Sequence, residues 1–320
     1  MEIETLLYTD QYREQVMALI CKEYNRNIND YSKFYEKFYE NEYQKNAIKV
    51  VAIEKESGNA VGFFALFVWP YFLNEKKFYS LKGVNAIVNP DYRGHGIFNK
   101  ILTTIDNELK KQQVDFLIAT PLDAAFYGFL KNGWEHLVDL DWSIKIINPF
   151  AFLIPLSTEK IKSALNEEKI YNLTNSDNNK IHLSDEEDFL AWRKYFYKIE
   201  KYYSSYSKDD KTIQFGLKLN VRKKIIRELI IGEVSTNSDN PEFIREGFLI
   251  LLIKIKQLKS ITIVSIAVNP SDKRIVDNLS QLGFKKIKNK IHIVVKDLSE
   301  NNMLMNPENW HLFRGDLDSW

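Results

Sequence analysis

The chain has 320 residues, of which 45% are hydrophobic and 27% are charged. These fractions are close to globular averages, so a disordered, collagen-like or coiled-coil protein is excluded, and the length suggests about two domains. Lysine and arginine total 44 against 43 aspartates and glutamates, a net charge of +1. This balance excludes the strongly basic character of many nucleic-acid-binding proteins, so we expect no nucleic-acid partner.

The cysteine content and the N-terminus indicate where the protein works. Cys21 is the only cysteine, so an intramolecular disulfide and a metal site built from thiolates are excluded, and we expect no metal centre. Residues 1–5 carry two glutamates where a secretion signal would be basic, which predicts a cytoplasmic protein. The longest apolar stretch, residues 60–73, is interrupted by Pro70 and is too short for a membrane span, so none is predicted.

In the first half, the spacing of apolar residues distinguishes helices from strands. Residues 48–53 and 60–69 are β-rich runs joined by a turn-forming stretch, which predicts a hairpin. In chain order, the expected elements are helices at 9–23 and 31–45, this hairpin, a strand at 81–88, a helix at 97–111, a strand at 114–119, and a short helix at 123–131 that ends at Gly133-Trp134.

The second half repeats this order in a weaker form. Its expected elements are strands at 225–231 and 261–267 and helices at 242–258 and 272–281, the last closed by Gly283-Phe284. The shared strand–helix–Gly-aromatic succession predicts a structural duplication, with its boundary in the connecting segment 148–182. We therefore predict an α/β fold with a mixed sheet, in two domains at residues 1–150 and 151–320.

The segment after the strand at 81–88 carries the chemistry. Asn89-Pro90 ends the strand, and Tyr92-Arg93-Gly94-His95-Gly96 makes a tight turn directly into the helix that begins at Ile97. Glycines let a ligand approach the backbone closely, the first amides of a helix lack partners, and the helix dipole favours negative charge. The pattern predicts a loop that binds phosphate, to which Arg93 adds a positive charge. A Gly-x-Gly turn by itself is common, so the order of the surrounding elements matters for this interpretation.

That order, with Val88-Asn89-Pro90 before the Arg-Gly-x-Gly loop, resembles the GCN5-related N-acetyltransferase (GNAT) family over about residues 1–146. The resemblance implies a GNAT-like fold and acetyl-CoA as co-substrate, with its pyrophosphate on the loop amides. It also implies that a backbone N–H near Val88 polarises the thioester carbonyl, where negative charge collects during acyl transfer. The cofactor-binding residues that it implies are Ile87, Val88, Arg93, Gly94, His95, Gly96 and Ile97.

The sequence departs from the family pattern in the short helix expected at 123–131. The tyrosine that often protonates the departing thiolate is replaced by Phe129, and Tyr127 stands two residues earlier, on another face of the helix. The asparagine that often contacts pantetheine is replaced by Leu122, whereas Ala125 matches the family. Cofactor binding is therefore better marked in the sequence than proton transfer.

Three residues are the candidates for acid–base catalysis, namely Asp123, Tyr127 and Glu54, and we also considered His95 and His136. Asp123 follows a strand end, where functional groups are common, but it suits the N-cap of a helix equally well. Glu54 begins a hairpin turn, which favours a solvated side chain.

The second half lacks the phosphate loop. Glu233 and Asp239 stand between its strand at 225–231 and its helix at 242–258, and acids there would repel pyrophosphate, so we predict no CoA site. This half resembles the degenerate second domain of tandem GNAT proteins, which either walls the acceptor side of the first site or is purely structural. Trp310 and Trp320 near the end of the chain predict that the tail docks.

Three residues are candidates for binding the acceptor. Asn85, on the strand at 81–88, would bond substrate or merely pair within the sheet. Trp192 and Tyr202 belong to an aromatic and basic cluster of a kind that binds sugars, although their spacing favours the core of a helix. The tail resembles the endings of tandem GNAT-like proteins associated with bacterial surface-polysaccharide synthesis, which implies an amino sugar as acceptor.

The sequence thus predicts an N-acetyltransferase that passes an acetyl group from acetyl-CoA to a small-molecule amine by direct attack in a ternary complex. A covalent intermediate is not expected, because Cys21 falls within a helix and no Cys–His pair is evident. The alternative is a non-catalytic CoA-binding or protein-interaction module with the same fold, which Phe129 favours. The acceptor's identity, N- or O-acylation and the oligomeric state are left open.

Overall fold

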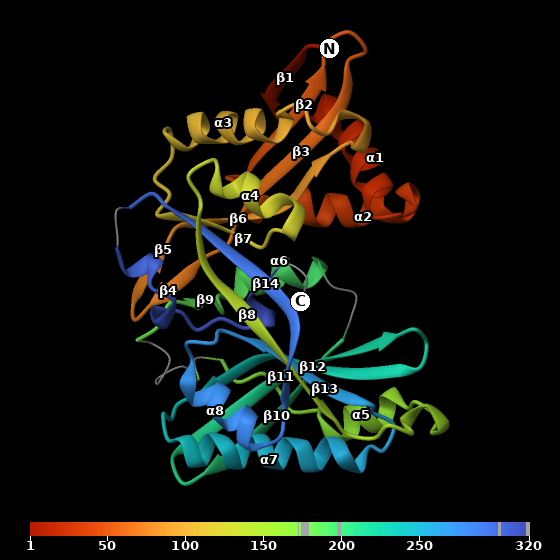
Figure 1. Cartoon of the computed structure of the whole chain (residues 1–320), viewed down its shortest axis with the longest axis vertical. Helices are drawn as coiled ribbons and strands as arrows, with labels where there is room; N and C mark the ends of the chain where they lie inside the picture. The colour runs from red at the N-terminus through yellow and green to blue at the C-terminus, as the bar shows by residue number, and fades with distance from the viewer. Residues whose placement is uncertain (172, 174–178, 197–199, 300–301, 318–320) are drawn as a thin grey trace.

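One mixed sheet runs through the whole molecule, with helices on both of its sides (Figure 1). The computed structural model describes residues 1–171, 173, 179–196, 200–299 and 302–317. In the described residues the large sheet has 11 strands, and a small sheet of 3 strands lies beside it. The polar residues 174–178 of the predicted connection, and Trp320, lie outside the described residues.

The first half follows the predicted order of elements and adds four strands that were not predicted, namely β1, β4, β5 and β8. Its strands are β1 (Ile3–Leu7), β2 (Ile48–Glu54), β3 (Asn59–Val68), β4 (Tyr71–Leu73), β5 (Lys76–Phe78), β6 (Ser80–Val88), β7 (Phe116–Ala119) and β8 (Glu135–Ile146). Its helices are α1 (Arg13–Glu23), α2 (Ile28–Tyr39), α3 (Ile97–Leu109) and α4 (Asp123–Leu130). Helix α2 begins earlier than expected because the Asn27 side chain caps its first amides, and it ends earlier, at Tyr39.

The second half confirms the predicted strand–helix–strand–helix order and adds a hairpin before it. Its strands are β9 (His182–Leu183), β10 (Lys201–Lys208), β11 (Lys211–Arg222), β12 (Ile226–Thr236), β13 (Ile263–Val268) and β14 (Lys285–Asp297). Its helices are α5 (Thr158–Ala164), α6 (Glu187–Arg193), α7 (Pro241–Gln257) and α8 (Lys273–Gln281). The helical interpretation of Tyr202 was wrong, because this residue lies on β10 and pairs with Leu217 of β11.

The two halves exchange strands at the centre of the sheet. The strand order is β1-β2-β3-β6-β7-β14-β8-β13-β12-β11-β10. The last strand of the second half, β14, therefore lies between β7 and β8 of the first half, and β8, the last strand of the first half, lies between β14 and β13 of the second. Val294 of β14 pairs with Ala119 of β7, and Asp141 of β8 pairs with Val268 of β13. The elements β7-α4-β8 and β13-α8-β14 therefore match, and each half completes the sheet of the other.

Both faces of the first-half sheet are buried, and alternate residues supply the two cores. Val50 and Ala52 of β2 face the core under α3 and α4, whereas Val51 and Ile53 face the core under α1 and α2. The core under α1 and α2 also includes residues of α6 and of the C-terminal tail, both from the second half, so this core joins the two halves.

Trp192 of α6 is the main aromatic contact between the halves. Its ring stacks on Phe38 of α2 with centroids 4.7 Å apart and meets Trp69 edge-on at 5.7 Å. Its Nε1–H donates to the carbonyl of Phe38 at 3.0 Å, and the side chain is 2% exposed. Its contacts are therefore those of a core residue, and acceptor binding by Trp192 stays a prediction.

We expect Trp192→Ala to lower the free energy of unfolding by about 3–5 kcal/mol, because a large buried ring leaves a cavity between the halves. Urea unfolding followed by circular dichroism measures this change. Tyr195→Ala, at a ring that is 39% exposed, is the matched control and should change stability by no more than about 0.5 kcal/mol. A Trp192→Ala protein as stable as the wild type would contradict the packing role.

Candidate functional site

The loop between β6 and α3 leaves backbone amides open to solvent. Gly94 and Gly96 adopt left-handed φ values of 83° and 70°, and a Cβ built on either would meet nothing within 4 Å. The amides of Gly94, His95 and Gly96 have no hydrogen-bond partner within the described part of the chain. Because they lie at the N-terminus of α3, they form the kind of site that binds phosphate groups.

The side chain of Arg93 lies behind this loop. Its Nε donates to the carbonyl of Val88 at 2.9 Å, and its guanidinium pairs with Glu23 of α1 at 3.1 Å. These contacts tie the loop to β6 and to α1. Arg93 therefore positions the loop, while the backbone amides offer most of the binding groups.

Strands β6 and β7 separate close to this loop. Their parallel pairing stops at Gly83 and Ala119, whereas β6 continues to Val88. Past the last pair, Asn85 and Ala86 together stand opposite Phe64 of β3, which makes a β-bulge. The backbone of β6 beyond Gly83 thus has no β7 partner.

Asn85 holds the bulge in place. Its φ of 56° is left-handed, which asparagine tolerates better than most residues. Its Nδ2 donates to the hydroxyl of Tyr39, the last residue of α2, whose side chain is fully buried. Asn85 thus shapes the strand at the point where the resemblance implies a thioester, and its contact with an acceptor stays a prediction.

A hydrogen-bonded network of charged side chains lies on the β7 side of this separation. His292 is on β14, two residues from the Val294 that pairs with Ala119, and it therefore lies beyond the end of β7. Its Nε2 donates to Asp123 at the start of α4 at 2.8 Å, and its Nδ1 donates to Asp139 of β8 at 2.7 Å. Asp139 also accepts from His136 and Lys290, both at 2.8 Å.

This network favours charged side chains. Burial raises the pKa of Asp139, but the hydrogen bonds from Lys290, His292 and His136 outweigh it and lower the pKa to about 2. Burial lowers the pKa of His292, but the bonds to Asp139 and Asp123 outweigh it, so the pKa rises above its usual value. Both ring nitrogens of His292 thus lie against carboxylate oxygens, an arrangement that favours the imidazolium form.

Nitrogens of His136 and His292 and one oxygen of Asp139 lie within 4.8 Å of one another, a grouping that could hold a metal ion. Lys290 already occupies the second oxygen of Asp139 with a positive charge. A histidine that donates from both nitrogens has no lone pair for a metal. We therefore interpret this grouping as an ion-pair network.

Comparison with known proteins identifies the first half. Residues 6–137 match the family model described as an acetyltransferase (GNAT) domain. This half is a GNAT acetyltransferase domain. The match confirms the resemblance seen in the sequence over this half, and a domain of this family supports acyltransferase activity with acyl-CoA.

Solved structures share the fold over nearly the whole chain. A conserved protein of Enterococcus faecalis, named a probable N-acyltransferase, has a TM-score of 0.61 at 11% identity, covering 93% of this chain and 73% of its own. A GCN5-related N-acetyltransferase of Anabaena variabilis has a TM-score of 0.62 at 12% identity, with coverages of 92% and 72%. The Saccharomyces cerevisiae N-myristoyltransferase with bound myristoyl-CoA has a TM-score of 0.57 at 9% identity, with coverages of 99% and 85%. At these identities the likeness shows the fold alone.

Two further comparisons bear on the whole chain. No curated protein matches the sequence. None of the helices in the described residues combines the length and the apolar character needed to cross a bilayer.

Within the GNAT domain, the acid–base candidates Tyr127 and Glu54 lie apart from the His292 network, whereas His136 belongs to it. Tyr127 is 70% exposed on α4, and its ring contacts Phe126. Phe129, where the family often has a tyrosine, is buried against Phe98 and Trp134. Glu54 ends β2, two strands away from β6, and accepts a hydrogen bond from Ser57 in the hairpin turn. Asp123 alone of the three candidates joins the network.

The remaining candidates divide between the loop and the core. Ile87 is buried in β6 and Ile97 at the start of α3, so both fix the ends of the phosphate loop. His95 is exposed within it, and its Nδ1 lies 3.0 Å from the carbonyl of Arg93. Tyr202 is 5% exposed on β10. The roles assigned to all of these residues stay predictions.

The sequence did not reveal His292 or Asp139. His292 is separated from Asp123 by 169 positions, and only the exchanged strand β14 brings them together. The alternation of Lys290 and His292 on one strand was the available signal, because residues two apart share a face of a sheet.

In the second half, the matching strand separation is filled by the chain itself. Pairing of β12 with β13 stops at Ile231 and Ile266, and beyond it Phe313 of the tail bridges to Val268. The tail also places Gly315 so close to Gly232 that any Cβ would collide with its carbonyl. The first amides of α7 are capped by the Asn240 side chain. These contacts support the prediction that this half binds no CoA.

We expect the imidazole of His292 to titrate with a pKa above 6.5. Asp139→Asn should lower this pKa, because the substitution removes a negatively charged partner. The stabilisation from the imidazolium is complete below pH 6.5 and is lost as the pH rises through the raised pKa. NMR titration of the histidine ring protons measures both effects. Asp141→Asn, at the carboxylate paired with Lys286, is the control that should leave His292 unchanged. A wild-type pKa at or below 6.5 would contradict the network.

Proposed function

We propose that the protein transfers an acetyl group from acetyl-CoA to the amine of a small molecule, with an amino sugar as the acceptor class. The observation that carries this proposal is the loop of open amides at the N-terminus of α3, next to the point where β6 and β7 separate. A site of this kind offers a phosphate contact and a gap in the sheet side by side. The match of residues 6–137 to the GNAT family supports acyl-CoA as the donor.

Binding of the donor is expected to rest mainly on the loop. The amides of Gly94, His95 and Gly96 would donate to the pyrophosphate, and the dipole of α3 would add to this attraction. The pantetheine would follow β6 toward the bulge at Asn85 and Ala86. Unpaired amides of β6 beyond Gly83 would then donate to the thioester oxygen, where negative charge develops during acyl transfer.

Gly94→Asp is expected to weaken acetyl-CoA binding about 100-fold or more, because it places a carboxylate where the pyrophosphate would bind. Calorimetric titration should give one site per wild-type chain. Gly58→Asp is a matched control, since Gly58 also has a left-handed φ, of 68°, and open space around its Cα. Two sites per chain would contradict the prediction for the second half, and unchanged affinity in Gly94→Asp would contradict the site.

The transfer itself requires two proton movements. The amine nitrogen attacks the carbonyl carbon, the C–S bond breaks, and the sulfur leaves with the electron pair. The amine must lose a proton, and the thiolate must gain one. We propose that Asp123 accepts the proton of the amine and that His292, as an imidazolium bonded to Asp123, holds this carboxylate in place.

A direct attack is favoured over a covalent enzyme intermediate. Cys21 is 5% exposed in α1, and burial raises the pKa of its thiol. A buried, protonated thiol is a poor nucleophile. Holding the amine and the thioester together in a ternary complex would then supply much of the acceleration.

Asp123→Asn is expected to lower kcat about 100-fold or more, since general-base catalysis commonly contributes that much, and to leave acetyl-CoA affinity unchanged. Release of CoA, followed with a thiol reagent, measures kcat on the best acceptor from an amine panel led by amino sugars. Glu135→Gln, an exposed position on β8, is the control. Wild-type activity in Asp123→Asn would contradict its role.

A second candidate function is a CoA-binding or protein-interaction module without turnover. The buried Phe129 favours it, because no hydroxyl is available there to protonate the thiolate. Stoichiometric acetyl-CoA binding with no CoA release from any acceptor would support this alternative over the enzyme.

A further inference from the structure

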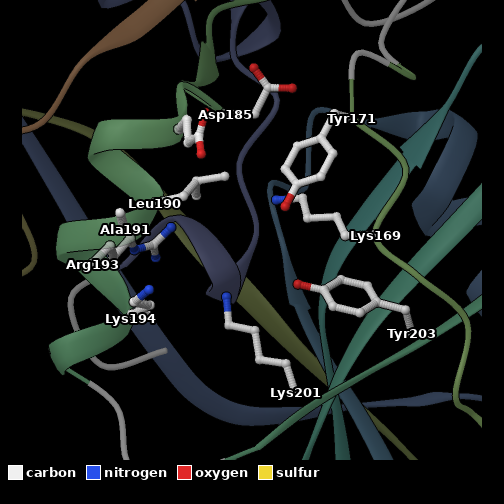
Figure 2. A pocket seen from close by; sticks show the side chains of 10 residues that line it. Lys169, Tyr171, Asp185, Leu190, Ala191, Arg193, Lys194, Lys201 and Tyr203 are labelled. Atoms are coloured by element: carbon white, nitrogen blue, oxygen red, sulfur yellow. The ribbon is translucent and has the colours of Figure 1, made fainter.

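A large cavity lies in the second half, between α6, the segment around Lys169 and the strand β10. Its volume of about 800 Å³ is within the range of about 300–1,000 Å³ that is usual for small-molecule sites. Its basic lining residues are Lys169, Arg193, Lys194 and Lys201, and Tyr171 and Tyr203 line it as well. Figure 2 shows these side chains directed toward a common space from opposite walls.

The cavity has an excess of positive charge at one end. Lys201 pairs with the carboxylate of Glu233 at 2.8 Å, and Lys169 lies 3.7 Å from the same carboxylate. The single carboxylate of Glu233 thus interacts with two lysines, while Arg193 and Lys194 add two further positive charges on the opposite wall of the cavity. The acids at the cavity, Asp185 and Glu187, belong to the other end, at the start of α6.

The pKa values of neighbouring groups agree with this charge distribution. Burial, together with the charges of Lys201 and Arg193, lowers the pKa of Lys218 to about 7. Burial raises the pKa of Glu233, but Lys201 and Lys169 outweigh it, so the pKa falls. Both shifts indicate a positive potential around this end of the cavity.

Arg193 supplies a second, independent observation. Its side chain is 4% exposed, and its Nη2 donates to the carbonyls of Gly315 and Leu317 in the tail. Its Nε–H is buried and has no hydrogen-bond partner among the described residues. A buried donor without a partner is unfavourable, and an acceptor oxygen of a ligand would satisfy it.

We propose that this cavity is a binding site for a small molecule bearing an oxyanion, either a phosphate or a carboxylate group. The oxyanion would lie between Lys201 on β10 and Arg193 and Lys194 on α6, with the Tyr203 hydroxyl as a further donor. Proteins commonly bind phosphate and carboxylate groups with guanidinium and ammonium groups that converge from separate elements. The site is separate from the acetyl-CoA loop in sequence and in its elements, so it stands or falls independently of acyl transfer.

The test uses the full chain with inorganic pyrophosphate and tricarballylate as probes. Calorimetry is carried out with the CoA loop already saturated by CoA, and again on Gly94→Asp, so that the loop does not contribute. The double variant Lys169→Gln/Lys194→Gln removes one cation from each wall at side chains that reach solvent. The double variant Lys256→Gln/Lys285→Gln removes two exposed lysines away from the cavity and is the matched control.

We expect one site per chain for at least one probe, and which probe binds tells phosphate from carboxylate recognition. The Lys169/Lys194 variant should bind about tenfold or more weakly, and the control should stay within about twofold of the wild type. Lys194→Gln alone, at an exposed side chain, provides the same comparison if the double variant does not fold. No binding of either probe, or equal binding by the cavity and control variants, would overturn the proposal.

Discussion

The exchange of β14 and β8 at the centre of the sheet is the constraint on which the rest of the structure depends. A strand needs a partner along each edge, because unpaired backbone groups are costly when buried. Here β7 obtains its outer partner from the end of the chain, and β13 obtains its partner from the first half. Neither half therefore completes its own sheet. The same exchange brings His292 to Asp123, so the second half contributes to the candidate site although it has no phosphate loop of its own.

The two halves share one arrangement of strands, but the strand separation is open in the first half and filled in the second. In each, a parallel pair separates after four residue pairs. In the first half no other strand of the described residues enters the separation, which adjoins the open amides before α3. In the second half the tail enters it, with Phe313 bridging to Val268 and His311 donating to the carbonyl of Val234 at 2.9 Å. Satisfied backbone groups have nothing left to offer a cofactor, and this is the physical reason for predicting CoA binding in the first half alone.

Helix α6 connects the two sites through consecutive residues. Trp192 points into the aromatic core and stacks on Phe38, whose neighbour Tyr39 accepts the hydrogen bond from Asn85 at the bulge. Arg193 lines the cationic cavity and donates to the tail. Successive residues of a helix point in different directions, so seven residues are enough to join the core, the tail and the cavity wall.

The sequence by itself determined the features that depend on neighbours along the chain. The turn at Arg93-Gly94-His95-Gly96 and the helix after it follow from local backbone preferences, and the apolar spacing gave most helices and strands within a few residues. Tyr202 was misassigned because aromatic spacing on a short segment suits a strand as well as a helix. The partner of Asp123, the filling of the second strand separation and the cationic cavity were decided only by the tertiary structure. Each joins residues many positions apart, and a sequence pattern of short range carries no information on which distant strand will supply the missing hydrogen bonds.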